Sequence, residues 1–417
     1  MSDDKIIFFG EDRKAEIEKQ QDNAKKHQIF HAFFRELFKL NNVSFLFGTG
    51  PSIPLGAKSM GEMYDSAVAK LDASTKKVIE AVMEKYGNKN DFENFLGLLY
   101  QLCDLNKKGV KTEFPVKDED INEFKKAFFE LCDFFDNMDE KEAIKKVNDH
   151  RIFISKILTR SLALKRANIF TTNYDLVLEK AMDEEGVICV NGFVGNTSRK
   201  LKPESFNYDY YFPATTTEGK VHRLDKVIHF YKLHGSINWL RTSPTPDNPY
   251  GVEEKDIGLV RGYDDKGDVM IYPTPAKENL STMFPYSDLF RKFANIIQQP
   301  QSVLCTIGYG FGDEHINRLI KEALTIPSFQ LVVVNKSETD GMGVFLETKD
   351  PRISVIIGEE YGVFHNFVEN VLPNIEQLEM KKQMQKTLKI LFREHNNDGS
   401  DDDDEQQPSI PDGDTPF

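Results

Sequence analysis

The sequence lacks the features that mark a secreted, zinc-stabilised or membrane-spanning protein. It has four cysteines in 417 residues, and no two of them form a Cys-x-x-Cys pair. This spacing excludes a structural zinc site of that type and disfavours a disulfide framework. No apolar run approaches the roughly 20 residues that cross a bilayer. The N-terminus starts with acidic residues, unlike a signal or transit peptide. We therefore expect a cytoplasmic protein without a membrane partner.

An excess of positive charge is also missing. The chain carries 67 acidic residues against 53 lysines and arginines, a formal net charge of −14. Eight of the acids lie in residues 396–417, which contain no lysine or arginine. This tail has too little apolar area to order itself, so we expect it to be disordered. Nucleic-acid-binding domains are usually basic, and we do not expect the isolated chain to bind nucleic acid.

Short apolar runs, each followed by a glycine or a polar residue, recur along the chain. Helical patterns separate several of them. Buried strands that alternate with helices predict an α/β fold with a Rossmann-like parallel sheet covered on both faces. The predicted strands are residues 43–48, 168–172, 229–235, 302–310, 330–335 and 353–358.

The remaining patterns predict how the chain is divided. Ser59 and Glu62 form a capping-box pattern that starts a long helical block, and residues 241–285 are rich in turn residues. The predicted parts are an N-terminal helical segment (1–42, with a helix over 11–40), a Rossmann-like domain (43–59 and 166–365), a helical insertion (60–165), a C-terminal helix (366–395) and the tail (396–417).

Four phenylalanines crowd the end of the predicted N-terminal helix, at positions 30, 33, 34 and 38. One interpretation is that the helix packs on the body of the protein. The other is that the rings form a contact with another copy or a partner. The sequence leaves both open.

Two glycines, Gly48 and Gly50, directly follow the first predicted strand. A parallel sheet binds ligands at the carboxyl ends of its strands. Glycines at that position let backbone N–H groups approach a pyrophosphate. The full Gly-x-Gly-x-x-Gly spacing is missing, so a simple tight turn explains this motif equally well.

Asn173 and His234 also stand at the carboxyl ends of predicted strands. Asn173 lies near the start of a helix, where an asparagine or aspartate is a favoured cap, but its amide can also hold a ribose hydroxyl or a water. A lone histidine is more often structural than catalytic. At this edge, however, His234 is placed to act as a general base near neutral pH, and Gly235 would let a ligand come close.

Two later strands end in the same way. Gly308, with further glycines at 310 and 312, loosens the turn after one strand, and Asp313 can cap the helix that follows. We interpret His315 as a helix-surface residue. Asn335 and Glu338 follow the next strand, where an amide or a carboxylate can accept from a ribose hydroxyl.

In order and spacing these motifs resemble the sirtuin family, over residues 43–60 and 165–365. GTGPS looks like the family's Gly-Ala-Gly-x-Ser phosphate loop, TTNYD like its Thr-Gln-Asn-Ile-Asp segment, and LHG like its catalytic His-Gly. GYG stands where the family has Gly-Thr-Ser. NKSE is similar to the ribose-binding Asn-x-Glu region, with one extra residue.

The resemblance implies a role for each residue. Asn173 would hold the nicotinamide ribose and a water, Asp175 the carboxamide, and His234 would be the base. The other implied NAD⁺-binding residues are Gly48, Thr49, Gly50 and Ser52 at the phosphates, Gly308, Asn335 and Glu338 on the adenosine side, and also Thr172 and Gly235.

The sequence departs from protein-deacylating sirtuins in two places. It has no pair of Cys-x-x-Cys motifs after His234, and PSIPLGAKSM stands where that family has an Asp-Phe-Arg loop. Deacylation is therefore the least favoured activity. TTNYD and GYGFGDEHIN instead resemble the NAD⁺-hydrolysing sirtuin-like domains of bacterial anti-phage defence proteins. Length and layout are most similar to the sirtuin-like partner of a HerA-type ATPase.

This resemblance implies an NAD⁺ glycohydrolase that works as a homo-oligomer, with NAD⁺ as substrate and no separate cofactor or metal. Two alternatives remain. One is a non-catalytic module that senses NAD⁺ or another nucleotide. The other is a nuclease component acting with an ATPase partner, although the sequence has no obvious carboxylate cluster for two metals.

Overall fold

The computed structural model describes residues 5–8, 13–89, 92–135, 138–212, 222–262 and 285–373. All described residues belong to one compact unit that ends at Pro373. Most of the predicted C-terminal helix and the whole acidic tail lie outside the described residues. Within them, no helix is long and apolar enough to span a membrane.

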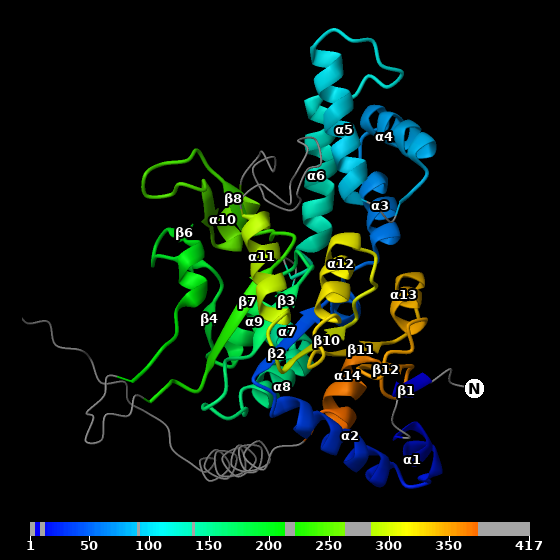
Figure 1. Cartoon of the computed structure of the whole chain (residues 1–417). Coiled ribbons are helices and arrows are strands. Elements are labelled where there is room, and N and C mark those ends of the chain that lie inside the picture. The colour runs from blue at the N-terminus through cyan, green and yellow to red at the C-terminus, as the bar shows by residue number, and fades with distance from the viewer. Residues whose placement is uncertain are drawn as a thin grey trace, which may run out of the picture. The chain divides into compact units, whose positions relative to one another are not determined.

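The centre of the molecule is an eight-stranded sheet in the order β1-β12-β11-β10-β2-β3-β7-β4 (Figure 1). Every neighbouring pair is parallel except β1 with β12. The prediction of a mainly parallel α/β sheet is therefore confirmed. The strands are β1 (Lys5–Phe8), β2 (Asn42–Phe47), β3 (Asn168–Thr171), β4 (Ile188–Val190), β7 (Val227–Lys232), β10 (Ser302–Ile307), β11 (Gln330–Asn335) and β12 (Ile353–Ile357).

The central strands are buried on both faces. Side chains that point to either face are therefore apolar, and these strands are continuous apolar runs in the sequence. In β2, Phe45 and Phe47 point into one hydrophobic cluster, and Leu46 points into another on the opposite face. Helices cover both faces. On the first lie α2 (Asn23–Phe38), α8 (Asn148–Ile157), α9 (Val177–Glu184), α14 (Phe364–Asn366) and the π-helical turn η5 (Phe367–Val371); on the second lie α11 (Tyr286–Ile297) and α12 (Glu314–Ala323).

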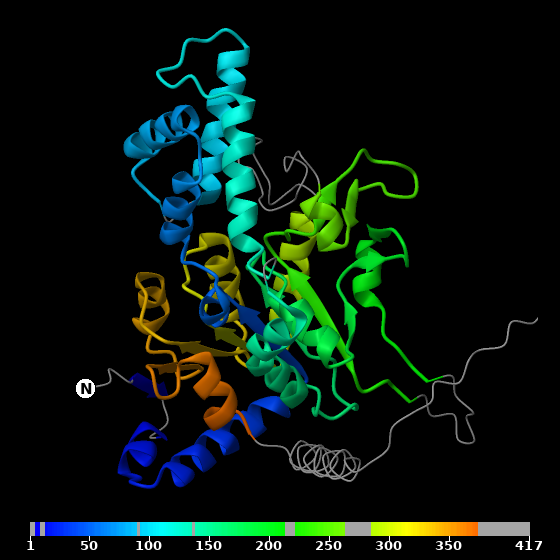
Figure 2. The same ribbon diagram turned by 180° about the vertical axis from the view of Figure 1, so that it is seen from behind.

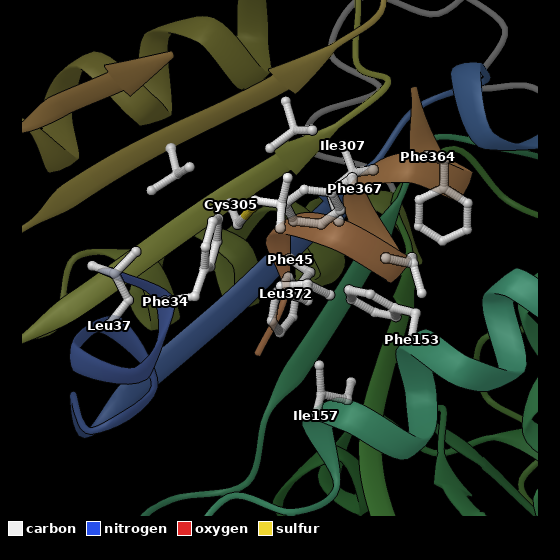
Figure 3. Packing of buried hydrophobic residues seen from close by; sticks show 14 of the residues in the cluster. Phe34, Leu37, Phe45, Phe153, Ile157, Cys305, Ile307, Phe364, Phe367 and Leu372 are labelled. Atoms are coloured by element: carbon white, nitrogen blue, oxygen red, sulfur yellow. The ribbon is translucent and has the colours of Figure 1, made fainter. Parts of the chain in front are cut away.

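The phenylalanines of α2 face the body of the protein. Phe30, Phe33 and Phe34 are buried in the hydrophobic cluster of the sheet, α8 and the residues around Phe367. Figure 3 shows Phe34 among these residues. Phe38 is partly buried against the same cluster. The structure thus favours the first interpretation of these rings, because burial leaves no exposed aromatic patch for another chain to contact.

A helical block lies between β2 and β3 and stands apart from the sheet (Figures 1 and 2). The capping box at its start is present, with the Ser59 backbone N–H donating to Glu62 at 2.9 Å. The block has a hydrophobic cluster of its own, which also takes in Tyr174 and Ile237 from turns after β3 and β7. Its helices are α3 (Met60–Ala69), α4 (Ala73–Tyr86), α5 (Phe92–Lys107) and α6 (Asp118–Cys132). The next helix, α7 (Glu140–Lys146), packs instead with α8 and α9.

A small antiparallel sheet of four strands, in the order β5-β6-β9-β8, was not expected from the sequence. Each strand has only two or three residues, too few to show an alternating pattern. Part of it falls in residues 241–285, which we predicted as loops; residues 263–284 lie outside the described residues. The strands are β5 (Phe193–Val194), β6 (Arg199–Leu201), β8 (Trp239–Arg241) and β9 (Val252–Glu254), and α10 (Ile257–Arg261) follows.

The N-terminal segment also differs from the prediction of helix alone. Residues Lys5–Phe8 form β1, which pairs with β12 at the edge of the sheet. The predicted helix is broken into α1 (Arg13–Lys19) and α2, because the Asp22 carboxylate caps a new helix by accepting from the Ala24 backbone N–H at 2.9 Å. The remaining short helices are η1 (Gly50–Leu55), η2 (Pro203–Asn207), η4 (Asp340–Met342) and α13 (Gly343–Leu346).

The order of the strands defines a topological switch point. From β2 the chain adds β3 and β7 on one side of the sheet, and then adds β10, β11 and β12 on the other. The reversal falls between β2 and β10. In open α/β sheets, ligands bind outside the carboxyl ends of the strands at such a point.

Candidate active site at the carboxyl ends of the strands

The predicted site residues come together because the parallel strands are in register. Phe47 of β2 is level with Thr171 of β3 and Ile307 of β10. Thr171 is level with Lys232, and Ile307 with Val334. One residue further on, the next row holds Gly48, Thr172, Leu233, Gly308 and Asn335. The predicted motifs, which are spread along the chain from Gly48 to Asn335, thus meet at one edge of one sheet.

Gly48, Gly50 and Gly308 pack backbone against backbone at the switch point. The Gly50 N–H donates to the Gly308 carbonyl oxygen at 3.1 Å. A Cβ at Gly48 would lie 2.4 Å from that same oxygen, and a Cβ at Gly50 would lie 2.7 Å from the Gly308 Cα. Gly308 itself has a φ of +59°, which disfavours a side chain there. The glycines are therefore required by the close approach of the two turns.

Asn173 is buried beside these glycines. Its Nδ2 donates to the Gly48 carbonyl oxygen at 3.0 Å and to the Ser52 Oγ at 3.2 Å. Its backbone N–H donates to the Thr171 Oγ1 at 3.0 Å. The Asn173 Oδ1 is buried and has no hydrogen-bond partner among the described residues. A buried acceptor without a partner costs about 1–3 kcal/mol, so this oxygen is suited to receive a hydroxyl or a water.

His234 lies two residues after β7, and its side chain is only 10% exposed. The Nε2 atom forms a hydrogen bond with the Asp313 Oδ2 at 2.9 Å. The imidazole also lies near two aromatic rings, Tyr174 at 6.4 Å and Phe290 at 6.2 Å between centroids. Gly235, which follows it, has a φ of +92° and makes the sharp turn after the histidine.

Asp175 is buried, and its carbonyl oxygen accepts from the buried Lys232. Burial raises the pKa of Asp175, although the ammonium of Lys232 and hydrogen bonds from Val177 and Ser52 oppose the rise. Lys232 Nζ donates to the carbonyl oxygens of Tyr174 and Asp175, and to Glu179 Oε1 at 2.7 Å. These hydrogen bonds from Lys232 therefore fix the turn that carries Asn173.

Lys232 also pairs with a second buried carboxyl group, that of Glu179. Burial raises the pKa of Glu179 to about 7, against the opposing effect of Lys232. An unpaired buried charge is far more costly than a paired one. The lysine is thus part of the structure beneath the site.

The other predicted residues fall into two groups. Thr49 precedes η1, Ser52 lies inside it next to Asn173, and Thr172 continues the ladder through its N–H to the Phe47 carbonyl oxygen at 3.1 Å. Asn335 is buried and donates to the Tyr309 carbonyl oxygen at 2.9 Å. These residues lie along the row of strand ends.

Glu338 lies apart from the row. It is exposed and paired with Lys5 of β1 at 2.6 Å, three residues past the end of β11. The structure does not bring this carboxylate into contact with the other predicted residues.

No group of three or more His, Cys, Asp or Glu side chains that could hold a metal ion occurs in the described part of the chain. The four cysteines are separate thiols.

Residues 167–338 match the family model of the SIR2-like domain. The matched segment starts just before β3 and ends at Glu338, so it contains Asn173, His234 and Asp313. It does not include the Gly48–Ser52 turn. The part of the chain that holds the buried amide and the imidazole is thus SIR2-like in sequence.

A search of curated proteins finds no match to the chain. Solved structures of sirtuins are similar to it at a low level, and each covers 82% of this chain. One comes from a study of sirtuin substrate affinity (13% identity, TM-score 0.37, 96% of that chain). A Sir2 mutant with a p53 peptide and NAD has 12% identity and a TM-score of 0.35 over 95% of that chain. Sir2 bound to an acetylated peptide has 13% identity and a TM-score of 0.32 over 95% of that chain.

Two residues of the site were missed by reasoning from sequence. We assigned Asp313 only to the cap of the following helix, yet it also contacts His234. Lys232 was not singled out at all. The available signal was a charged residue inside an otherwise apolar strand, directly before Leu233 and His234, since a lysine is rarely buried without a partner.

Proposed function

We propose that the protein is an NAD⁺ glycohydrolase that cleaves NAD⁺ into nicotinamide and ADP-ribose. The observation that carries this proposal is the pair of buried polar side chains, Asn173 and His234, at the ends of neighbouring strands beside the switch point. The SIR2-like match over the segment that contains both residues supports it.

The reaction needs one water and no redox partner. The bond between the nicotinamide nitrogen and the ribose carbon breaks, and its electron pair leaves with nicotinamide. The ribose passes through an oxocarbenium-like transition state, as in glycoside hydrolysis. Water then forms the new C–O bond, and its proton is released. The products are nicotinamide, ADP-ribose and one proton.

Each residue has a defined task in this scheme. The Asn173 Oδ1 accepts from a ribose hydroxyl or orients the attacking water. His234 accepts a proton from a ribose hydroxyl or from that water, a step that general base catalysis accelerates by about 10²–10⁴-fold. The backbone N–H groups of the glycine turn at Gly48 and Gly50 are suited to bind the pyrophosphate.

The finer parts of the proposal rest on the sequence resemblance. We propose a role in anti-phage defence by depletion of NAD⁺, activity as a homo-oligomer, and a HerA-type ATPase as partner. An enzyme that drains NAD⁺ must be controlled. The helical insertion, residues 60–165, is our candidate for the gate, because the hydrophobic cluster of its helices α3–α6 includes Tyr174, one residue after Asn173.

Incubation of the purified chain with NAD⁺, followed by chromatography of the products, tests the activity. The assay is run with and without the neighbouring gene product as a candidate activator. We expect nicotinamide and ADP-ribose to form in equal amounts, and to form faster when the activator is present. NAD⁺ that stays intact under all of these conditions would refute the proposal. Binding of NAD⁺ without turnover would instead favour the sensing module.

A further inference from the structure

Asp313 makes two different sets of hydrogen bonds with its two carboxylate oxygens. Its Oδ1 accepts from the backbone N–H groups of His315 and Ile316 at 2.8 and 3.1 Å, which caps α12. Its Oδ2 lies 2.9 Å from the His234 Nε2. The helix cap needs only one oxygen, so the second is left to the histidine.

The pair lies in surroundings that strengthen it. The side chains of His234 and Asp313 are 10% and 15% exposed, and charges interact more strongly away from water. Among the described residues, the titratable groups near the imidazole include Tyr174 from the turn after β3, Asp313, and His315, whose ring lies 6.4 Å from the Phe290 ring between centroids. Asp313 forms a hydrogen bond with the ring, between its Oδ2 and the His234 Nε2 at 2.9 Å.

Asp313 keeps its charge in this position. Burial alone would raise the pKa of its carboxyl group, but the hydrogen bond from His234 and the N–H groups at the start of α12 bring the pKa below its usual range. A carboxylate at a helix N-terminus is also favoured by the helix dipole.

The turn before Asp313 holds the carboxylate in place. Phe311 is buried in a left-handed conformation, with a φ of +57°, a state that costs energy and persists only when the surroundings enforce it. Its carbonyl oxygen accepts from Asn317 Nδ2 at 2.7 Å, and Ile316 and Ile320 anchor α12 in the core. Asp313 cannot turn away from His234 without giving up the cap.

We infer that Asp313 is a positioning residue for His234, an inference that rests on the proposed hydrolysis. The carboxylate accepts from Nε2–H and thereby fixes the tautomer in which Nδ1 is the proton acceptor. When Nδ1 takes the proton from the ribose hydroxyl or the water, the carboxylate stabilises the imidazolium that results. Asp313 itself stays ionised throughout.

The Asp313→Asn variant tests this, because asparagine has nearly the same size and is also a favoured helix cap. It removes the charge and can favour the other tautomer of His234. We expect kcat to fall by about 100-fold and KM to change by less than about threefold, since substrate contacts are untouched. The acid side of the pH–rate profile should move to lower pH by roughly one unit.

A second readout does not depend on activity. The ¹⁵N imidazole signals of His234, assigned by their loss in His234→Gln, should titrate at a lower pH in Asp313→Asn, and the tautomer balance should move away from Nε2–H. Asp313→Ser, which also keeps a capping oxygen, provides the same test if the asparagine variant does not fold.

Asp72→Asn is the matched control. Asp72 caps α4 through the backbone N–H groups of Ser74 and Thr75 at 2.8 and 2.9 Å, so it changes the same kind of cap without changing the charge next to His234. We expect wild-type kcat and an unchanged titration. If Asp313→Asn matches this control in rate, pH profile and imidazole signals, the inference is wrong.

The two proposals fail in different ways. A wild-type chain that does not consume NAD⁺ under any condition refutes the hydrolase, while the imidazole titration still decides whether Asp313 positions His234. A chain that consumes NAD⁺ through His234, but is indifferent to Asp313→Asn, keeps the hydrolase and removes the positioning residue.

Discussion

The two sides of the candidate site differ in the groups that form them: backbone atoms on one side and polar side chains on the other. On the side of β2 and β10, Gly48, Gly50 and Gly308 bring backbone against backbone, and any added atom would clash. On the side of β3 and β7, Asn173 and His234 present buried polar side chains held by named hydrogen-bond partners.

We therefore expect residues on the two sides to matter for different properties: for the stability of the fold on the glycine side, and for activity on the other side. The glycine side has a shape that the fold depends on, and it offers only backbone groups to a ligand. The other side carries Asn173 and His234, the side chains that we propose react, and both lie after the ends of their strands. Substitutions of Asn173 or His234 should therefore lower activity with little loss of stability, whereas substitutions of the glycines should lower stability.

The largest effect should come from removing the reactive groups. Asn173→Ala and His234→Ala should each lower NAD⁺ turnover by at least about 100-fold, while stability falls by no more than about 1–2 kcal/mol. Nicotinamide release and thermal melting measure the two quantities. His315→Ala, at an exposed histidine near the same edge, is the control and should keep its activity. If both site variants turn over NAD⁺ at the wild-type rate, the site assignment is wrong.

The glycine side should show the reverse pattern. In Gly48→Ala the new Cβ would meet the Gly308 carbonyl oxygen at 2.4 Å. Both are backbone positions that cannot easily move, so we expect a loss of about 3 kcal/mol in the free energy of unfolding. Gly312→Ala is the control, since a Cβ there meets nothing within 4 Å. Urea denaturation compares the two, and equal stability of both variants would contradict this interpretation of the turn.

A third test compares two buried histidines. His234 has a carboxylate partner, whereas His150 lies among aromatic rings. Its ring centroid is 4.6 Å from that of Phe364 and 6.4 Å from that of Phe47. Burial lowers the pKa of His150 to about 3. The folded protein therefore binds fewer protons than the unfolded chain between that value and the ordinary pKa of about 6.5. Stability should be fully present above pH 6.5 and fall as the pH is lowered.

The His150→Phe variant should reduce this acid sensitivity. Because a difference of one pKa unit corresponds to about 1.4 kcal/mol, we expect His150 to account for roughly 2–3 kcal/mol of the loss between pH 7 and pH 4.5. Thermal melts across that range measure it. The exposed His222→Gln variant should behave like the wild type, and an equal acid sensitivity in His150→Phe would show that another group is responsible.

The smallest effect should come from deleting the acidic tail. Its composition predicts that it buries little apolar area. Deletion of residues 396–417 should change the free energy of unfolding by less than about 0.5 kcal/mol, as measured by urea denaturation. A clear fall in stability after truncation would mean that the tail packs on the folded protein.

The sequence predicted the central strands because they are buried on both faces and therefore consist of unbroken apolar runs. It also placed Gly48, Asn173, His234 and Asn335 at strand ends, since polar residues and glycines end those runs; the structure has the first three just after their strands and Asn335 as the last residue of β11. Once the sheet is parallel, its carboxyl ends share one edge, and the convergence of these residues follows. The chemical roles of the residues stay predictions.

The short elements could not be predicted in this way. The strands β5, β6, β8 and β9 have two or three residues each, and β1 is a strand only because β12 lies beside it. Glu338 shows the same limit, since it follows the right strand but points to Lys5 at 2.6 Å. Position along a strand gives the edge of the sheet, but not the direction of a side chain three residues later.

By itself, then, the sequence determined which residues are apolar, where the strands end and which polar groups stand there. Only the tertiary structure decided that β10 lies beside β2 and that Asp313 reaches His234 from 79 residues away in the chain. It also decided that Lys232 donates to the carbonyl oxygen of Tyr174, in the turn that carries Asn173. The physical reason is that burial patterns are local properties of the chain. A hydrogen bond between distant residues depends on how strands are ordered and how tightly turns approach, and no single segment contains that information.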